Sequence, residues 1–215
     1  MLSNVSHTAL PFSNDGEVAP ISPDAIRILV MAVSTRRDSY NRKLAHAVHD
    51  SVCEMWVGST LLELSDYPLP LYNADFEAIN GMPGNVLRLK EIIARHQGMI
   101  VISPEQNFSM PAVLKNTLDW VARPLPDQVG HQPFRRKPVS LMSASTSCPF
   151  GGQRGLRHIR DVLTGMGMHV LPHELSVSQA HKAFARNGTL RDMEVRGRIV
   201  EVTEELVRTS ERLHR

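Results

Sequence analysis

The chain has 215 residues and carries 24 Lys and Arg side chains against 22 Asp and Glu, which gives a formal net charge of +2 with neutral histidines. This near balance argues against a nucleic-acid-binding protein, because such proteins normally display a strongly basic face. Hydrophobic residues make up 42% of the chain and charged residues 21%, and this composition excludes disorder throughout the chain.

The cysteine content and the lengths of the apolar stretches indicate the cellular compartment in which the protein works. The two cysteines, Cys53 and Cys148, are too few for a disulfide framework, and this favours a reducing cytoplasm. No apolar stretch reaches the roughly 18 residues that a membrane span needs. The first residues lack the basic start and the apolar centre of a secretory signal. The sequence therefore predicts a cytoplasmic protein without a membrane span.

The chain changes character near residue 26. Residues 1–25 are polar, contain three prolines and show no hydrophobic periodicity, so we interpret them as a flexible N-terminal extension. The regular hydrophobic pattern begins at Ile26. Residues 26–215 are therefore predicted to form one domain, in line with the usual size of a compact unit.

Five apolar runs alternate with helical patterns along this domain. The first, IRILVMAV at 26–33, is continuously apolar, as expected for a strand covered on both faces. The other predicted strands are 60–66, 99–103, 138–145 and 169–175. Helical spacing follows each strand, in segments that begin near residues 39, 84, 110, 152 and 195. Two prolines at 68 and 70 and the pair Asn80-Gly81 predict a long loop ahead of the second helix.

Strands that alternate with helices predict a doubly wound α/β fold. Five such strands favour the flavodoxin-like parallel sheet with strand order 2-1-3-4-5 and helices on both faces. In that order, ligands bind outside the carboxyl ends of strands 1 and 3. We therefore look for the function in the loops that follow the first, third and fourth strands.

The loop after the first strand, STRRDSYN at 34–41, leads directly into a helix. Its hydroxyl and guanidinium groups, with the free N–H groups of a helix start, are partners that suit a phosphate dianion. An ordinary N-capped helix with polar decoration explains the same pattern equally well.

The loops after the third and fourth strands are the other candidates. SPEQNFSMP at 103–111 is constrained by two prolines and could present backbone N–H groups and Asn107 to the edge of a planar ring. The alternative is a stiff connection in which Ser109 caps the next helix. SASTSCPFGG at 143–152 is a small-residue loop that runs into a helix. Three polar loops at one sheet edge favour a ligand site more than any one of them does.

Several familiar motifs are absent from the sequence. It contains no G-x-G-x-x-G, no G-x-x-x-x-G-K-[ST] and no G-x-S-x-G, which excludes a dinucleotide fingerprint, a P-loop and a nucleophile elbow. The ten histidines form no H-E-x-x-H motif. His46 and His49 are predicted to lie on a solvated helix face rather than in a metal site, and no metal is expected.

The loops resemble motifs of the NADPH-dependent FMN reductase family, flavodoxin-like enzymes that include quinone, azo-dye and chromate reductases. The family pattern G-S-x-R-x-x-S-x-N is similar to VSTRRDSYN at 33–41. The pattern P-E-Y-N-x-S-x-P-x-x-L-K-N-A-I-D-W is similar to PEQNFSMPAVLKNTLDW at 104–120. ASTSCPFGGQR at 144–154 and YPLPLYN at 67–73 also resemble family segments.

The resemblance implies an FMN-dependent NAD(P)H oxidoreductase. Hydride would pass from NADPH or NADH to flavin N5 and then to a quinone, free flavin or similar small-molecule acceptor in a ping-pong sequence, so no catalytic side chain is required. The implied FMN phosphate ligands are Ser34, Arg36, Ser39 and Asn41. The whole implied cofactor-binding set is Ser34, Arg36, Ser39, Tyr40, Asn41, Pro104, Glu105, Gln106, Asn107, Phe108 and Ser145. A homodimer or homotetramer is also implied.

Two other functions stay open, one of them because the sequence departs from the family pattern. Val33 replaces the glycine before the phosphate loop, and Gln106 replaces the tyrosine of the second motif. One alternative is therefore a degenerate relative with a binding or regulatory role, in which Val33→Gly would restore FMN affinity. The other is a non-enzymatic electron carrier of the flavodoxin kind, which the absence of a strongly acidic composition argues against.

Overall fold

Strand β2, Arg27–Ala32, lies inside the sheet and is covered on both faces. In the computed structural model, which describes residues 8–9, 26–125, 132–147 and 149–214, the side chains of Ile28, Leu29 and Val30 are 0% exposed. The continuous apolar run therefore marks a strand that is buried on both sides, as the sequence indicated.

Five parallel strands form the body of the sheet. Besides β2 these are β3 (Gly58–Glu63), β4 (Gly98–Ile102), β5 (Pro138–Ala144) and β6 (His169–Val177). Their spatial order is β3-β2-β4-β5-β6, and every neighbouring pair is parallel. Counted along the chain this is the order 2-1-3-4-5, so the predicted flavodoxin-like sheet is confirmed.

A short sixth strand extends the sheet at the β3 edge. β1, Thr8–Ala9, pairs antiparallel with β3, and Thr8 lies opposite Thr60. These two residues belong to the segment that we interpreted as a flexible extension. The remainder of that segment, residues 1–7 and 10–25, lies outside the described residues.

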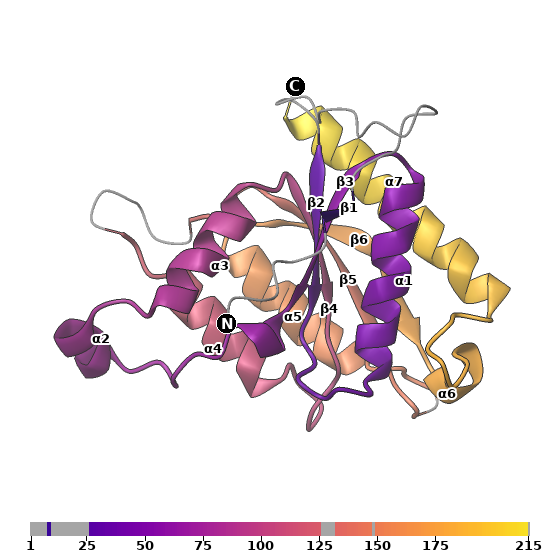
Figure 1. Cartoon of the computed structure of the whole chain (residues 1–215), viewed down its shortest axis with the longest axis horizontal. Coiled ribbons are helices and arrows are strands. Elements are labelled where there is room, and N and C mark those ends of the chain that lie inside the picture. Colours follow the sequence, from indigo (N-terminus) through magenta and orange to yellow (C-terminus); the bar gives the residue numbers. More distant parts are fainter. Residues whose placement is uncertain (1–7, 10–25, 126–131, 148, 215) are drawn as a thin grey trace.

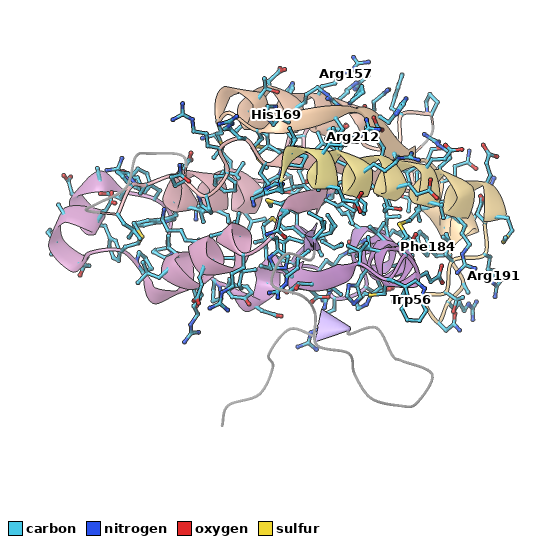
Figure 2. All side chains as sticks on the ribbon, turned by 90° about the horizontal axis from the view of Figure 1, so that it is seen from above. Trp56, Arg157, His169, Phe184, Arg191 and Arg212 are labelled. Carbon is cyan, nitrogen blue, oxygen red and sulfur yellow. The ribbon has the colours of Figure 1, made fainter. Side chains whose placement is uncertain are left out.

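Helices cover both faces of the sheet (Figure 1). On one face lie α1 (Tyr40–Glu54) and α7 (Met193–Leu213), with the short α6 (Ala180–Ala183) beside them. On the other face lie α3 (Gly84–Ala94), α4 (Ala112–Val121) and α5 (Gln153–Gly165). Side chains fill the space between these helices and the sheet (Figure 2). None of the described helices combines the length and apolar character needed to cross a bilayer.

The connection from β3 to α3 differs from the long loop predicted by the sequence. The strand ends at Glu63, a single 3₁₀ turn follows, and a further helix, α2, spans Ala74–Asn80. Asn73 caps α2, because its Oδ1 accepts hydrogen bonds from the N–H groups of Asp75 and Phe76 at 2.8 and 3.0 Å. The prediction of an uninterrupted loop was wrong, since this cap begins a helix between the prolines and Gly81.

His49 also departs from its prediction. Its side chain is 7% exposed, and its Nδ1 lies 2.8 Å from Ser59 Oγ. The expected solvated face is therefore wrong for His49, because α1 packs against β3 at this point. His46, one turn earlier, has a side chain that is 58% exposed and does face solvent.

Candidate functional site

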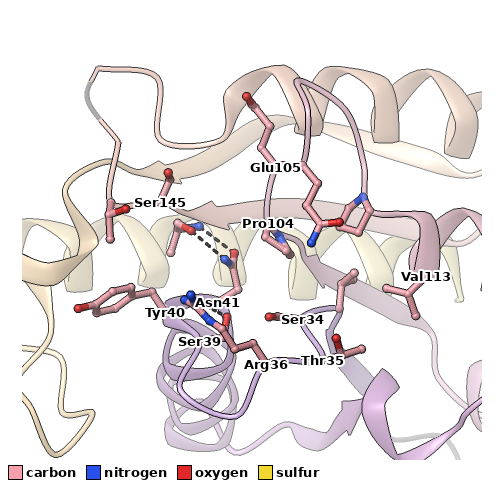
Figure 3. Close-up of a pocket in the computed structure, with 15 residues that line it drawn as sticks. Ser34, Thr35, Arg36, Ser39, Tyr40, Asn41, Pro104, Glu105, Val113 and Ser145 are labelled. Carbon is pink, nitrogen blue, oxygen red and sulfur yellow. Dashed lines mark hydrogen bonds between the residues drawn. The ribbon is translucent and has the colours of Figure 1, made fainter.

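A cleft of about 280 Å³ opens at the carboxyl edge of the sheet, where the loops after β2, β4 and β5 meet (Figure 3). The strand order reverses here, because β2 lies between β3 and β4. The cleft is near the lower end of the size range of small-molecule sites, so a larger ligand would keep part of its surface exposed. Its lining residues are Val33, Ser34, Thr35, Arg36, Ser39, Tyr40, Asn41, Pro104, Glu105, Gln106, Pro111, Val113, Ala144, Ser145 and Thr146.

The first loop places several donors beside the start of α1. Ser39 is the N-cap and accepts a hydrogen bond from the Asn41 N–H at 3.2 Å, and the first turn of α1 contains no acid. Within the described part of the chain, the Ser34 hydroxyl and the Arg36 guanidinium make no hydrogen bond or ion pair. Free hydroxyl and guanidinium donors at the positive end of a helix suit a phosphate or another dianion.

Asp38 is the acid of this loop, and its charge is compensated. It forms an ion pair with Lys43, and the hydrogen bond and charge of Lys43 hold the pKa of the Asp38 carboxyl below its ordinary value. The carboxylate is therefore paired rather than free to repel an anion in the cleft.

Asn41 joins two of the loops that form the cleft. Its side chain is 3% exposed, its Nδ2 donates to the Ala144 carbonyl at 2.8 Å, and its Oδ1 accepts from the Ala144 N–H at 2.9 Å (Figure 3). This pair of hydrogen bonds fixes the start of α1 to the end of β5. From the sequence, Asn41 was expected only to bind the ligand, and nothing in the sequence pointed to this contact.

The second loop turns back on itself as a tight hairpin. The Gln106 N–H donates to the Ser109 carbonyl and the Ser109 N–H donates to the Gln106 carbonyl, both at 3.0 Å. Asn107 and Phe108 form the tip, with φ angles of +48° and +65°. Ser109 is not the cap of the next helix, because α4 begins at Ala112 with Pro111 as its N-cap.

The third loop contributes Ser145 and Thr146 to the cleft and then turns into α5. Gly152 has a φ angle of +96°, and a Cβ atom at this position would overlap Ser143 Oγ. Only glycine fits this turn without strain. The third loop therefore reaches the cleft because the chain can turn sharply here.

The structure gathers most of the predicted cofactor-binding residues around the cleft. Those that line it are Ser34, Arg36, Ser39, Tyr40, Asn41, Pro104, Glu105, Gln106 and Ser145. Asn107 and Phe108 lie at the hairpin tip and are not part of the lining. Tyr40 extends toward α6, where its ring centroid is 6.1 Å from that of Phe184. Direct contact between these residues and a cofactor stays a prediction.

Several lining residues were absent from the predicted set. They are Val33, Thr35, Pro111, Val113, Ala144 and Thr146. Thr35, Ala144 and Thr146 adjoin predicted residues in the same loops, and that proximity is the signal that could have identified them. Helical spacing places Val113 on the apolar side of the helix predicted to begin near residue 110, and this spacing does not distinguish a cleft wall from a core.

The sequence of this chain matches a known protein family. The sequence model of the family described as NADPH-dependent FMN reductase matches residues 26–182. An NAD(P)H-dependent FMN reductase of Pseudomonas aeruginosa is 35% identical over 175 residues, which cover 80% of this chain and 89% of that protein. A quinone reductase of Escherichia coli is 31% identical over 148 residues, covering 69% and 74% of the two chains.

A solved structure agrees with the sequence comparisons. The flavoenzyme NAD(P)H:(acceptor) oxidoreductase FerB of Paracoccus denitrificans superimposes with a TM-score of 0.73 at 27% identity, over 87% of this chain and 98% of that chain. The segment that the family model matches, residues 26–182, contains all three loops of the cleft. The chain belongs to the NADPH-dependent FMN reductase family.

Proposed function

We propose that this protein is an FMN-dependent NAD(P)H oxidoreductase that reduces quinones, free flavin or similar small acceptors. The observation that carries the proposal is the cleft itself, in which hydroxyl and guanidinium donors without a hydrogen bond or ion pair to any described residue adjoin the start of α1, next to two further polar loops. The printed functions of the relatives, FMN reductase and quinone reductase, support the same activity.

The residues present fit the phosphate of FMN. Ser34, Arg36 and Ser39 would hold that phosphate, and the backbone of residues 104–106 would border the ring. Among the described residues that line the cleft, Glu105 is the only acid, and its carboxylate is bonded to the Gly155 N–H. The cleft therefore favours an anionic ligand. When bound, FMN would supply the hydride acceptance and donation that no side chain in the cleft can provide.

The open cleft supports a ping-pong order of substrates. A ligand held at its phosphate end in a cleft of this size leaves a face accessible, and donor and acceptor can use that face one after the other. The cytoplasm is part of this proposal, since a chain with two cysteines suits a reducing compartment.

A homodimer is a further part of the proposal. Leu71 and Ile79 are 82% and 81% exposed on the segment that carries α2. That segment is fastened to α4, because the Trp120 Nε1 donates to the Pro70 carbonyl at 2.8 Å. Large exposed apolar side chains on an anchored segment are typical of a protein–protein contact. Sedimentation analysis of wild type and Leu71→Asp tests the assembly, and a wild-type monomer would contradict it.

The test of the activity begins with the visible spectrum of the purified protein before and after loading with FMN and removal of the excess. We expect about one FMN per chain to remain bound. A protein that cannot be loaded would contradict the proposal and favour the degenerate relative.

Steady-state kinetics then separate an enzyme from an electron carrier. We expect NADPH or NADH oxidation with a benzoquinone at rates well above those of free FMN at the same concentration. Double-reciprocal plots at several quinone concentrations should give parallel lines. A flavin-loaded protein without this turnover would favour the carrier, and intersecting lines would contradict the ping-pong order.

A further inference from the structure

The side chain of Glu105 points away from the phosphate loop, which is the loop of residues 34–41, and toward α5 (Figure 3). Glu105 Oε2 accepts a hydrogen bond from the Gly155 N–H at 3.0 Å. The first turn of α5 contains no acid, and its N-cap, Gly152, has no side chain that could accept a hydrogen bond. Glu105 therefore supplies from another loop the anion that usually caps a helix from within.

Gly155 allows this contact by letting two backbones approach closely. A Cβ atom at position 155 would lie 3.1 Å from the Ser109 carbonyl oxygen and 3.3 Å from Glu105 Cα. These separations are tighter than ordinary contacts, so a larger residue would push the hairpin away from α5. The glycine and the carboxylate form one local arrangement.

Two further contacts join the same hairpin to the same helix. Ser109 Oγ lies 2.9 Å from His158 Nδ1, and the Arg154 guanidinium lies 4.9 Å from the centroid of the Phe108 ring. We call these two contacts and the Glu105–Gly155 hydrogen bond the α5 clamp. The Glu105 bond is the least exposed of the three, since Gly155 is buried and Glu105 is half-buried, whereas Phe108, Arg154 and His158 are exposed. It is therefore the contact that water competes with least.

We propose that Glu105 is a positioning residue: acting through the first turn of α5, its carboxylate holds the hairpin of residues 104–109 in the conformation that borders the flavin ring. The proposal rests on the proposed function, because it takes the ligand of the cleft to be a flavin. It adds that the hairpin is arranged before the ligand arrives, and that the side chain of Glu105 serves the site without touching the ligand.

The arrangement also removes a charge conflict. A free carboxylate in this cleft would repel an anionic ligand, whereas the same charge at a helix N-terminus is stabilised by the helix dipole. Replacement by alanine removes the acceptor for the Gly155 N–H. Replacement by glutamine keeps a carbonyl oxygen that can accept from the Gly155 N–H, so glutamine should restore most of the function.

The first experiment uses the protein without flavin. Amide hydrogen exchange of Gln106 and Ser109, which donate the two hairpin hydrogen bonds, is compared in wild type, Glu105→Ala, Glu105→Gln and the control Glu91→Ala on α3. We expect exchange to become about tenfold faster in Glu105→Ala, as the loss of one charge-assisted hydrogen bond predicts. Exchange in Glu91→Ala should match that of wild type, and exchange in Glu105→Gln should stay within about twofold of it, because the glutamine side-chain oxygen can still accept from the Gly155 N–H.

The second experiment measures affinity for FMN and for riboflavin, which shares the ring and lacks the phosphate. Glu105→Ala should weaken both by a similar factor of about ten. The ratio of the two dissociation constants should stay unchanged, because the phosphate loop is not altered. A partly unfolded sample would lower both apparent affinities by the same factor, so the readout that identifies the clamp is the faster exchange of the hairpin amides in a variant that is otherwise folded.

The outcomes separate the clamp from the proposed function. Unchanged exchange in Glu105→Ala, or equal impairment in Glu105→Ala and Glu105→Gln, would overturn the positioning role even if flavin binds. If wild type binds neither flavin, the proposed function fails, and with it the part of the proposal that concerns the ring. Should Glu105→Ala not fold, Ser109→Ala removes one weaker contact of the clamp and should accelerate exchange at Gln106 by about threefold; no acceleration would overturn the clamp.

Discussion

Replacing Asn41 by alanine would disconnect two of the loops that form the cleft. The Asn41 side chain is 3% exposed, and its amide exchanges two hydrogen bonds with the backbone of Ala144, which is 4% exposed. Alanine would leave the N–H and the carbonyl of Ala144 without these partners at a buried position. The start of α1 would also lose its direct connection to the end of β5.

The expected cost follows from the two groups left unpaired. A buried backbone donor or acceptor that loses its partner costs about 1–3 kcal/mol, so the loss of two partners should lower the free energy of unfolding by about 2–6 kcal/mol. That is a large part of the roughly 5–15 kcal/mol by which domains are stable. Water that enters from the open cleft would bring the value toward the lower end.

Urea unfolding of the flavin-free proteins measures this loss. Asn85→Ala is the matched control, because the half-buried Asn85 side chain makes a single, solvent-exposed hydrogen bond, in which its Nδ2 donates to the Pro68 carbonyl at 3.0 Å. The control should lose less than about 1 kcal/mol. If Asn41→Ala unfolds like wild type but no longer binds FMN, Asn41 acts only as a ligand and our structural interpretation is refuted.

Four other substitutions test further parts of the fold. Val33 is 0% exposed and packs into the core. Val33→Gly should therefore lower the free energy of unfolding by about 3 kcal/mol without tightening FMN binding. Tighter FMN binding would revive the degenerate-relative hypothesis. Burial lowers the pKa of Lys137 to about 8 from 10.5. Between pH 8 and 10.5 the unfolded chain binds more protons than the folded chain, so the free energy of unfolding should rise with pH. The rise should be larger by about 1–3 kcal/mol in wild type than in Lys137→Met. Equal pH profiles of the two proteins in urea unfolding would contradict this. Gly152→Ala should be strongly destabilising because its Cβ would overlap Ser143 Oγ, whereas Gly197→Ala, in α7 with nothing within 4 Å, should stabilise by up to about 1 kcal/mol in the same assay.

The sheet and its strand order could be predicted from the pattern of hydrophobic residues. The continuously apolar run at 26–33 requires cover on both sides, and the alternation of strands and helices then leaves few ways to order the sheet. The strand order also predicts where loops meet, so the position of the cleft followed from local pattern and topology alone. No contact between particular side chains was needed for that inference.

Three features of the structure were not predicted, each for its own reason. The cap at Asn73 is a short local signal that two prolines and an Asn-Gly pair obscured, and α2 was missed for that reason. His49 was expected in solvent, because helical spacing does not reveal that Ser59 on a neighbouring strand lies beside it. The outward position of Asn107 and Phe108 arises from the hairpin hydrogen bonds between Gln106 and Ser109, which a linear motif does not encode.

The residues of the matched motifs divide by what their polar atoms already bind. Among the described residues, Ser34 and Arg36 make no side-chain hydrogen bond or ion pair, so their donors are available to a ligand. Asn41 and Glu105 are engaged with the backbone of Ala144 and Gly155, and these two links join the three loops to one another. A ligand that binds loops already fixed in place does not have to order them, which strengthens binding. The same motif therefore contains groups that bind the ligand and groups that hold the binding groups in place, and only the structure distinguishes them.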